Sequence, residues 1–367
     1  MKNLIFSTCG TSILTNNADD VLRPLFIQHA NVKNAADISL SEERGYICAH
    51  IEERKKRFVN YSYQEAKKYS AEINGILSFY GGQLTKENKH DIHYLLATDT
   101  WLGEETANIV KLWLEANGFT DIRVYRHVDL QTSDLQAFRV SLANLVKWCD
   151  ENIKPQRTEH CRVIFNLSGG FKSETGFLQM LGMFYADETI YIFERSNELM
   201  RIPHLPIKMD DEESIQKDLH DFRRAALNLD VHSEKYGIYW FEIDGMYSLT
   251  EWGELIFAHY KAEIYQKQIY PAPSEKIIFS PPFLNSCDNE TAANKREINE
   301  KIDLFARFLE NAKHPNPYSL HYHPVTHPHD DRVTHEFYAY SNNGAKRIYC
   351  HSLDEGKVEL LFLGKHL

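Results

Sequence analysis

The sequence predicts a mixed α/β protein that begins with a doubly wound, mainly parallel sheet and ends with a smaller α+β domain. In the first half, short β-branched apolar runs alternate with amphipathic helical stretches, the order that produces parallel strands with helical crossovers. In the last quarter, one helical stretch precedes three strand-like runs joined by short turns, which is typical of a helix packed on an antiparallel sheet. The chain of 367 residues is long enough for two or three domains.

We assign the first domain to residues 1–195. Its predicted strands occupy residues 4–8, 92–98, 122–128, 162–168 and 189–194, and its amphipathic helices residues 104–117, 133–151 and 171–185. Because strands and helices alternate, we expect parallel strands with helices on the faces of the sheet. The long segment 15–83 interrupts the alternation and is largely helical by composition. Its charged run, Glu52 to Arg57, is interpreted as a solvated helix face.

Residues 196–272 form the predicted middle module. A helix at 213–228, a strand at 237–243 and a helix that begins after the N-cap Thr250 suggest a winged-helix-like arrangement. Such modules commonly bind DNA. Here Glu251, Glu254 and Glu263 oppose DNA, and we see no basic recognition helix. A linker or dimerisation module is the better interpretation.

Residues 273–367 form the last predicted domain. A short strand, KIIFS, is followed by a helix at 294–312 and by strands at 334–341, 345–353 and 357–365. The connections Asn342-Asn343-Gly344 and Asp354-Glu355-Gly356 are both hairpin signals. We therefore expect an α+β domain in which a helix packs on an antiparallel meander.

The composition indicates a cytoplasmic protein. No run approaches the ~20 apolar residues of a membrane span, and the Met-Lys-Asn start lacks the features of a signal peptide. Six scattered cysteines without a C-x-x-C pair indicate a reducing compartment and argue against a cysteine-based zinc site. The net charge of -11 argues against broad non-specific nucleic-acid binding.

Two small-residue turns follow predicted strands and favour an anionic ligand. Residues 166–172 read NLSGGFK, and residues 7–12 read STCGTS. Glycines allow backbone N–H groups to approach a ligand closely, and the helix after the second turn adds partial positive charge beside Lys172. Neither turn matches G-x-G-x-x-G or G-x-x-x-x-G-K-[ST]. The alternative is a tight strand–helix turn with a surface lysine.

Two further strand ends offer polar side chains. Thr98, Asp99 and Thr100 follow the strand at 92–98, and Gln131 follows the strand at 122–128. The alternative for Asp99 or Thr100 is a helix N-cap, which is compatible with a ligand contact because anions also bind at N-caps. In a doubly wound sheet these strand ends share one edge, so all of the turns could line one crevice.

The last domain is rich in histidine. It holds eight of the chain's 18 histidines, namely His314, His321, His323, His327, His329, His335, His351 and His366. The segment HYHPVTHPHDD contains two prolines, which argue against a helix that could present a pair of histidines to a metal, so we predict no metal site. Metal-free RNA cleavage needs a base, a cation for the phosphorane and an acid. A sheet carrying His335, Arg347, Lys365 and His366 could provide all three, although a histidine-rich accessory domain without catalytic function remains the alternative.

The first ~195 residues resemble a CRISPR-associated Rossmann-fold (CARF) domain, in the branch whose turns read S-T-x-G-T-S and N-x-[ST]-G-G-F-K. The resemblance implies a homodimer that binds a cyclic oligoadenylate, with the tetra-adenylate as the expected size, across its two-fold axis. The implied ligand contacts are Gly10, Thr11, Ser12, Thr98, Asp99, Thr100, Gln131, Ser168, Gly169, Gly170 and Lys172. Some relatives also cleave the ring slowly, which implies roles for Ser12 and Lys172 in such a reaction.

The last ~35 residues resemble the RelE/HigB superfamily of ribosome-dependent mRNA interferases. The matching stretches are residues 335–337 (HEF), 346–349 (KRIY) and 360–366 (LLFLGKH). One departure is charge: residues 273–367 contain 11 Lys and Arg against 13 Asp and Glu, whereas these toxins are usually basic. The R-x-x-x-x-H spacing of the HEPN ribonucleases, the usual partners of such sensors, is absent, which favours the RelE-like interpretation.

Together the two resemblances imply a type III CRISPR ancillary effector. A cyclic oligoadenylate would activate a metal-independent endoribonuclease that cuts mRNA on the translating ribosome. We expect no resident cofactor, no membrane and no DNA partner. Two alternatives stay open: a ring nuclease or pure sensor with a carboxyl-terminal interaction domain, and a winged-helix transcription regulator, against which the acidic charge speaks.

Overall fold

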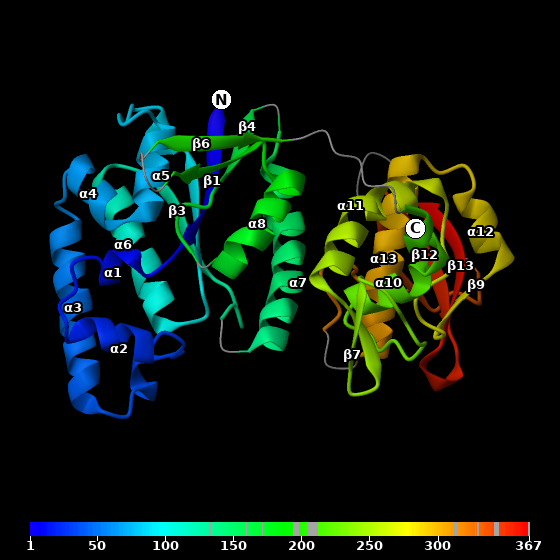
Figure 1. Cartoon of the computed structure of the whole chain (residues 1–367). Helices are drawn as coiled ribbons and strands as arrows, with labels where there is room; N and C mark the ends of the chain where they lie inside the picture. Colours follow the sequence, from blue (N-terminus) through cyan, green and yellow to red (C-terminus); the bar gives the residue numbers. More distant parts are fainter. Residues whose placement is uncertain are drawn as a thin grey trace. The chain divides into compact units, whose positions relative to one another are not determined.

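The computed structural model divides the chain into two compact units, Met1–Ile207 and Lys208–Leu367 (Figure 1). It describes residues 1–131, 134–158, 160–170, 172–193, 198–204, 212–311, 315–326, 328, 330–340 and 345–365, without the side chains of residues 136, 172 and 173. The predicted boundary between the first domain and the rest, at residue 195, lies close to the division between these units. We describe each unit by itself.

The first unit contains a six-stranded, mainly parallel sheet with the order β3-β2-β1-β4-β5-β6. Its strands are β1 (Lys2–Cys9), β2 (Ile92–Ala97), β3 (Asp121–Arg126), β4 (Cys161–Asn166), β5 (Glu188–Ile192) and β6 (Leu199–Pro203). The first five are parallel, as the alternation predicted. β6 runs antiparallel to β5 and was not predicted. Arg201 of β6 pairs with the buried Glu188 of β5 at 2.8 Å, which ties this edge strand to the sheet.

Helices cover both faces of this sheet (Figure 1). The crossovers are α6 (Trp101–Ala116), α7 (Leu135–Asn152) and α8 (Lys172–Tyr185). Because side chains alternate along a strand, Ile5 faces the core built with α3, α5 and α6, whereas Phe6 faces α7. On that second face Trp148 of α7 contacts Phe6, Tyr94 and Tyr125, one aromatic ring from each of three neighbouring strands.

The long segment between β1 and β2 is largely helical, as its composition predicted. It contains α1 (Ser12–Thr15), α2 (Leu22–Gln28), α3 (Ser41–Phe58), α4 (Tyr63–Tyr69) and α5 (Ala71–Phe79), and the chain also has short 3-10 turns at Ala35–Asp37, Asn88–His90, Lys154–Gln156 and Asp354–Gly356. The charged run Glu52 to Arg57 lies in α3. Its expected solvated face is wrong at one residue: Arg54 is buried, because it lies on the stripe formed by Ile47, Ile51 and Phe58.

The carboxyl-terminal part of the second unit is a helix on a mainly antiparallel sheet, as expected. Its sheet has the order β10-β11-β12-β13-β9, and only β9 runs parallel to its neighbour. The elements are β9 (Ile277–Phe279), α12 (Pro281–Cys287), α13 (Ala292–Glu310), β10 (His323–Pro324), β11 (His335–Tyr340), β12 (Lys346–Ser352) and β13 (Val358–Lys365). Glu355 and Gly356 adopt positive φ in the connection between β12 and β13, whereas residues 342–344 lie outside the described residues.

The rest of the second unit comprises α9 (Glu212–Lys217), α10 (Leu219–Ala226), the hairpin of β7 (Trp240–Ile243) and β8 (Met246–Leu249), and α11 (Glu251–Lys267). Asp244 and Gly245 form the hairpin turn with positive φ at both positions, the conformation that a two-residue turn favours. The predicted middle module and last domain pack together in this one compact unit.

A buried ion pair joins α10, α11 and α13. Arg223 Nε donates to Asp303 Oδ1 at 2.8 Å, and the Tyr265 hydroxyl donates to Asp303 Oδ2 at 2.5 Å. All three side chains are almost completely buried. Burial by itself would lower the pKa of Arg223, but the Asp303 carboxylate outweighs burial and raises it. The Arg223 cation therefore persists inside the unit and depends on its contact with Asp303.

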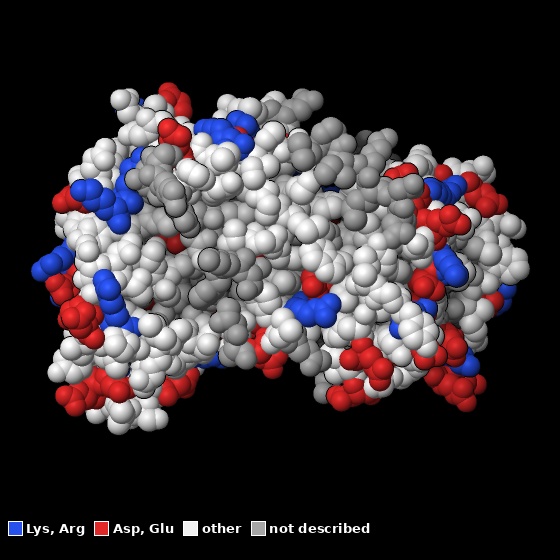
Figure 2. All heavy atoms as spheres, in the orientation of Figure 1, with Lys and Arg blue, Asp and Glu red and all other residues white. Residues whose placement is uncertain are grey.

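Two features bear on possible interfaces: the character of the helices and the charge on the face drawn in Figure 2. Within the described ranges, no helix combines the length and apolar character needed to cross a membrane. On the face drawn in Figure 2, Lys and Arg are interspersed with Asp and Glu in each unit, and the described residues form no continuous basic patch there. The six cysteines are all free thiols.

We predict that Asp303→Asn destabilises the second unit by about 3–5 kcal/mol, because it leaves the Arg223 cation buried without a counter-charge. The matched control is Glu300→Gln on the same helix, which breaks the partly exposed pair with Arg296 and should cost no more than about 0.5 kcal/mol. Urea unfolding of the full chain measures both changes. Equal effects of the two substitutions would contradict the prediction.

Candidate ligand-binding and catalytic sites

Two turns lie side by side at the carboxyl edge of the parallel sheet. Ser7 of β1 pairs with Asn166 of β4, so the turn at residues 10–12 and the turn at residues 168–170 leave neighbouring strands. The strand order reverses between β1 and β4, because β2 and β3 lie on one side of β1 and β4 and β5 on the other. Open α/β sheets bind ligands at such a switch point.

The two turns approach each other so closely that they exclude side chains. A Cβ on Gly10 would lie 2.9 Å from the backbone nitrogen of Gly170, and Gly170 has a φ of +94°. The Thr8 hydroxyl donates to the Gly169 carbonyl oxygen at 2.6 Å, which fastens the strand end to the opposite turn. The glycines of both motifs are therefore required by contact between the turns as well as by conformation.

Asn166 shapes the second turn from below. Its side chain is fully buried, and Nδ2 donates to Ser7 Oγ at 3.2 Å and to the Glu72 carbonyl oxygen at 2.9 Å. Its Oδ1 accepts from the hydroxyl and the backbone N–H of Ser168, at 2.7 and 3.3 Å. Asn166 thus acts on the turn geometry, and the Ser168 oxygen keeps lone pairs that can accept further hydrogen bonds.

Glu72 is part of this site and was not predicted from the sequence. Its carboxylate accepts from the Gly10 N–H at 2.8 Å and from the Ser70 hydroxyl at 2.6 Å, and an ideal Cβ on Gly169 would lie 2.1 Å from it. The side chain is fully buried. Burial raises the pKa of Glu72, although the hydrogen bonds from Ser70 and Gly10 oppose the rise.

The first turn carries the Ser12 hydroxyl and the Cys9 thiol, which differ in the chemistry open to them. Ser12 Oγ is buried and has no hydrogen-bond partner, so it can bond to a ligand. Burial, with the Glu72 and Glu174 carboxylates, raises the pKa of Cys9, so this thiol is no nucleophile near neutral pH. Thr11 precedes α1 as its N-cap residue and makes no side-chain capping bond.

Two more predicted ligand contacts, Lys172 and Gln131, lie in or beside the loops at this edge of the sheet. Lys172 is the first residue of α8, at the end of the second turn, but its side chain lies outside what the structure describes. Gln131 lies in the loop after β3, two strands away from β1, and is half-buried.

The side chains at residues 98–100 bond to other groups of the protein. Thr100 is the N-cap of α6 and accepts from the Gly103 N–H, and the Thr98 hydroxyl bonds to Thr100 at 2.9 Å. Asp99 pairs with Lys33 at 2.8 Å and Arg126 at 2.9 Å. Burial alone would raise the pKa of Asp99, but these partners and the Asp129 N–H hold it below its usual value. The capping alternative describes Thr100 correctly.

The four predicted catalytic residues do not gather on one face of the sheet. Arg347 lies opposite Gly364 of β13, whereas its neighbour Lys346 lies opposite Lys365. Since side chains alternate along a strand, Lys365 shares the Lys346 face. His335 pairs with Cys350, a residue of the core against α13, so it also lies on the face away from Arg347. His366 lies outside the described residues.

A different set of side chains surrounds Arg347. By register, Glu336 and Tyr338 of β11 and His323 of β10 share its face. His321 stacks on Tyr338, with ring centroids 5.0 Å apart, and lies 4.4 Å from the ring of His323. We call these five residues the Arg347 cluster. They combine two imidazoles, a guanidinium, a phenol and a carboxylate.

Arg347 is held in place but keeps bonding capacity. Its Cζ lies 3.7 Å from the centroid of the Tyr338 ring, and Nε lies 3.8 Å from Oε1 of the buried Glu336. Its Nη1 is buried and has no partner. A planar guanidinium with an unpaired N–H group matches a phosphate oxygen.

His323 is oriented by two oxygens. Its Nδ1–H donates to the His321 carbonyl oxygen at 2.8 Å, and Nε2 lies 3.3 Å from Glu336 Oε1. With Nδ1 already protonated, Nε2 can donate to Glu336 only as an imidazolium. His321 has a φ of +51°, a left-handed backbone that places consecutive polar groups in a tight turn.

The other histidines of this part serve elsewhere. His335 stacks on Tyr322 at 4.8 Å, and burial, with a smaller effect of His323, lowers its pKa. His351 donates to the Arg332 carbonyl oxygen at 2.6 Å. His314, His327 and His329 lie outside the described residues. Among the described residues, no group of three or more His, Cys, Asp or Glu side chains is placed to hold a metal ion.

Two sequence signals could have identified the Arg347 cluster. The period-two pattern of residues 335–340 puts Glu336 and Tyr338 on one face, and the H-x-H pair His321 and His323 precedes it. Glu72 gave no comparable signal, because its partners Gly10 and Gly169 are distant in sequence.

We predict that Glu72→Gln reduces the pH dependence of stability. A raised folded pKa means that the stability contributed by protonated Glu72 is fully present below the unfolded pKa and is lost as pH rises through the folded value. Glutamine can bond to both Gly10 and Ser70 without titrating. Urea unfolding measures the free energy of unfolding of parent and variant between about pH 5 and 8, where shifted carboxyls and imidazoles titrate. Parallel pH profiles of the two proteins would refute the assignment.

The comparisons bear on the first unit. Residues 67–205 match the sequence model of a family described as CRISPR-associated protein (Cas_APE2256). The matched segment includes Glu72, the strand end at residues 98–100 and the turn at residues 168–170. A comparison with curated proteins gives no match. The family match supports a CRISPR-associated protein.

Proposed function

We propose that this protein is a type III CRISPR ancillary effector in which a cyclic oligoadenylate activates an endoribonuclease that cuts translated mRNA. The observation that carries the proposal is the contact between the two glycine turns at the strand-order switch point. The second of these turns, residues 168–170, lies inside the segment that matches a CRISPR-associated family. The turns offer backbone N–H groups and hydroxyls rather than apolar surface, which suits a ligand with phosphates.

The ring would bind between two copies of the first unit. A ring of 3′–5′ linked adenylates carries one negative charge per unit and has its own symmetry, so a homodimer can present two copies of the same turns to it. The proposed contacts are Gly10, Thr11, Ser12, Gln131, Ser168, Gly169, Gly170 and Lys172. Thr98, Asp99 and Thr100 would support them from behind through the cap of α6 and the ion pairs with Lys33 and Arg126.

RNA cleavage is assigned to the Arg347 cluster. In this reaction the 2′-oxygen attacks the adjacent phosphorus, a 2′,3′-cyclic phosphate forms, and the bond to the 5′-oxygen breaks. His321 would accept the 2′-OH proton, Arg347 would stabilise the phosphorane, and His323 as an imidazolium would protonate the leaving 5′-oxygen. Glu336 orients His323 and Arg347 by its contacts with both. Proton balance is kept because one imidazole gains the proton that the other loses.

The order of the last elements supports a RelE-like interpretation of this part, because a helix precedes an antiparallel meander. The residues that sequence resemblance favoured, His335, Lys365 and His366, are replaced in the proposal by His321 and His323, because the register puts His335 and Lys365 on the opposite face from Arg347.

A second activity, slow cleavage of the ring itself, is favoured by one observation. Ser12 Oγ is buried without a hydrogen-bond partner beside the first turn. A hydroxyl in this state could position a 2′-hydroxyl of the ring, while Lys172 stabilises the charged transition state.

The function is tested by incubating a reporter mRNA with the full-length protein, with and without cyclic tetra-adenylate, in an active translation extract and in buffer alone. Cleavage that needs both the ring and translation supports the proposal. Equal cleavage of naked mRNA would show that the reaction does not require the ribosome. No cleavage under any condition, together with measurable ring binding or degradation, would favour a sensor or ring nuclease.

We predict that Lys172→Ala weakens ring binding by a factor of about 100 or more, since a charge-assisted hydrogen bond contributes ~1.5–3 kcal/mol and the dimer would lose two. The control is Lys154→Ala, which removes an exposed lysine paired with Asp150. Isothermal titration calorimetry with the tetra-adenylate measures both affinities. An unchanged affinity of the Lys172 variant would exclude this lysine from the site.

We predict that Arg347→Ala lowers ring-stimulated cleavage by about 10²–10³-fold and leaves ring binding unchanged. The matched control is Lys346→Ala, the adjacent cation on the opposite face, which pairs with Glu290 at 2.6 Å. Single-turnover cleavage of ribosome-bound mRNA compares the two. If the Lys346 variant loses the activity and the Arg347 variant keeps it, catalysis belongs to the face that carries Lys365.

A further inference from the structure

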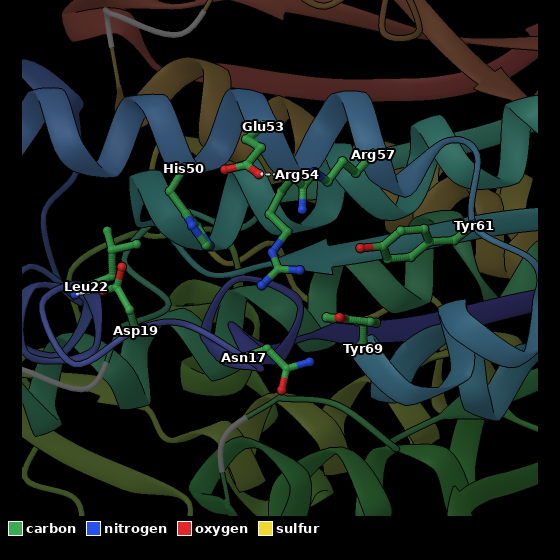
Figure 3. A pocket seen from close by; sticks show the side chains of 9 residues that line it. All are labelled: Asn17, Asp19, Leu22, His50, Glu53, Arg54, Arg57, Tyr61 and Tyr69. Carbon is green, nitrogen blue, oxygen red and sulfur yellow. Dashed lines mark hydrogen bonds and ion pairs between the residues drawn. The ribbon is translucent and has the colours of Figure 1, made fainter.

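A pocket of about 320 Å³ lies in the helical segment of the first unit, apart from the two glycine turns. Residues after α1, along α3 and at the end of α4 form its walls (Figure 3). It is lined by Asn17, Asp19, Leu22, His50, Glu53, Arg54, Arg57, Tyr61 and Tyr69. Nothing in the proposed ring site or in the Arg347 cluster uses these side chains.

Arg54 projects from α3 into the middle of this pocket (Figure 3). The residue is only 8% exposed. Its Nη2 donates to the Asn16 carbonyl oxygen at 2.7 Å, and its Cζ lies 4.9 Å from the centroid of the Tyr69 ring. Nε is buried and has no hydrogen-bond partner. The guanidinium is therefore fixed in position while part of its N–H edge stays unused.

No carboxylate of the described residues forms an ion pair with Arg54. Glu53, although it lines the pocket, pairs with Arg57 at 2.8 Å. Asp19 Oδ1 accepts from the backbone N–H groups of Val21 and Leu22, at 3.0 and 2.8 Å. A buried cation without a counter-charge is costly, so an anion in the pocket would relieve this cost.

The other polar groups of the pocket fit an oxyanion with several oxygens. Tyr61 and Tyr69 lie with ring centroids 5.1 Å apart, and their hydroxyls interact with each other and with Arg54. Arg57 stands near the opening with its side chain two-thirds exposed (67%). His50 bonds through Nε2 to the Leu14 carbonyl oxygen at 3.1 Å, and burial lowers its pKa, so it is neutral near pH 7.

We propose that this pocket binds the phosphate group of a small phosphorylated molecule, with Arg54 as the main contact and the Tyr69 hydroxyl as a further donor. A guanidinium fork matches two phosphate oxygens at once, and the Tyr69 hydroxyl, which accepts from Tyr61, can donate to a third. The pocket volume lies in the range of small-molecule sites, which begins at about 300 Å³.

Calorimetric titration of the full-length protein with inorganic phosphate, AMP and adenosine tests this proposal. Phosphate and AMP share the anion, adenosine lacks it, and the difference between phosphate and AMP shows whether the ester adds affinity. The variants are Arg54→Met, Arg54→Lys, the control Lys68→Gln on the exposed side of α4, and Lys172→Ala. The last variant separates this pocket from the glycine turns, where phosphate can also bind. Thermal melts without ligand establish which variants are folded.

We expect phosphate or AMP to bind the parent protein and the Lys68 and Lys172 variants alike. Arg54→Met should weaken binding tenfold or more, and Arg54→Lys should also weaken it, because a point charge lacks the fork. Arg54→Lys keeps the test valid if the methionine variant does not fold. The proposal fails if neither anion binds the parent at millimolar concentration, if adenosine binds as tightly as AMP, or if binding survives in the Arg54 variants and disappears with Lys172→Ala.

Discussion

The contact between the turns after β1 and β4 is the constraint on which the first unit depends. A Cβ on Gly10 would lie 2.9 Å from the backbone nitrogen of Gly170, and Gly170 has a φ of +94°, which a side chain rarely adopts. The buried Glu72 carboxylate accepts from the Gly10 N–H. Because β1 and β4 are neighbours at the strand-order switch point, this contact also decides where backbone N–H groups converge. The beginning of α8 lies at the same place, so its partial positive charge adds to the site.

Two buried carboxylates among the described residues are compensated by cations. Asp303 balances Arg223, and Asp99 is balanced by Lys33 and Arg126. Among the described residues, six buried side-chain atoms have no hydrogen-bond partner, and two of them, Glu105 Oε2 and Arg223 Nη2, still lie in ion pairs with Lys55 and Asp303. Three others, Ser12 Oγ, Arg54 Nε and Arg347 Nη1, lie where we propose that a ligand or substrate binds. An unpaired buried polar group costs free energy, so it persists mainly where a ligand uses it. His93 Nδ1 is also unpaired, but burial lowers the pKa of His93 to about 3, so it stays neutral inside the sheet.

The predictions that succeeded rest on local patterns. Alternation of apolar strands and amphipathic helices predicted five parallel strands, and the hydroxyl- and glycine-rich turns marked the ends of β1 and β4. The helix and meander of the last part followed from hairpin signals and apolar periodicity. The errors arose where packing decides. Arg54 belongs to a charged run, yet its helical position puts it on the buried stripe of α3. The strand β6 is too short and too exposed to be distinguished from a linker by pattern alone.

The sequence by itself determined which residue types stand at each strand end, because glycine, small hydroxyl residues and alternating apolar residues act through local backbone conformation. Only the tertiary structure decided which of these residues meet. Strand order brings Gly10 against Gly170 and places Glu72 beneath them, although 62 and 160 residues of sequence separate Gly10 from Glu72 and Gly170. In the second unit, strand register gives Arg347 to the face of His323 and Glu336 and gives Lys365 to the other. Register and strand order depend on pairing between distant segments, and a shift of one residue would exchange the two faces.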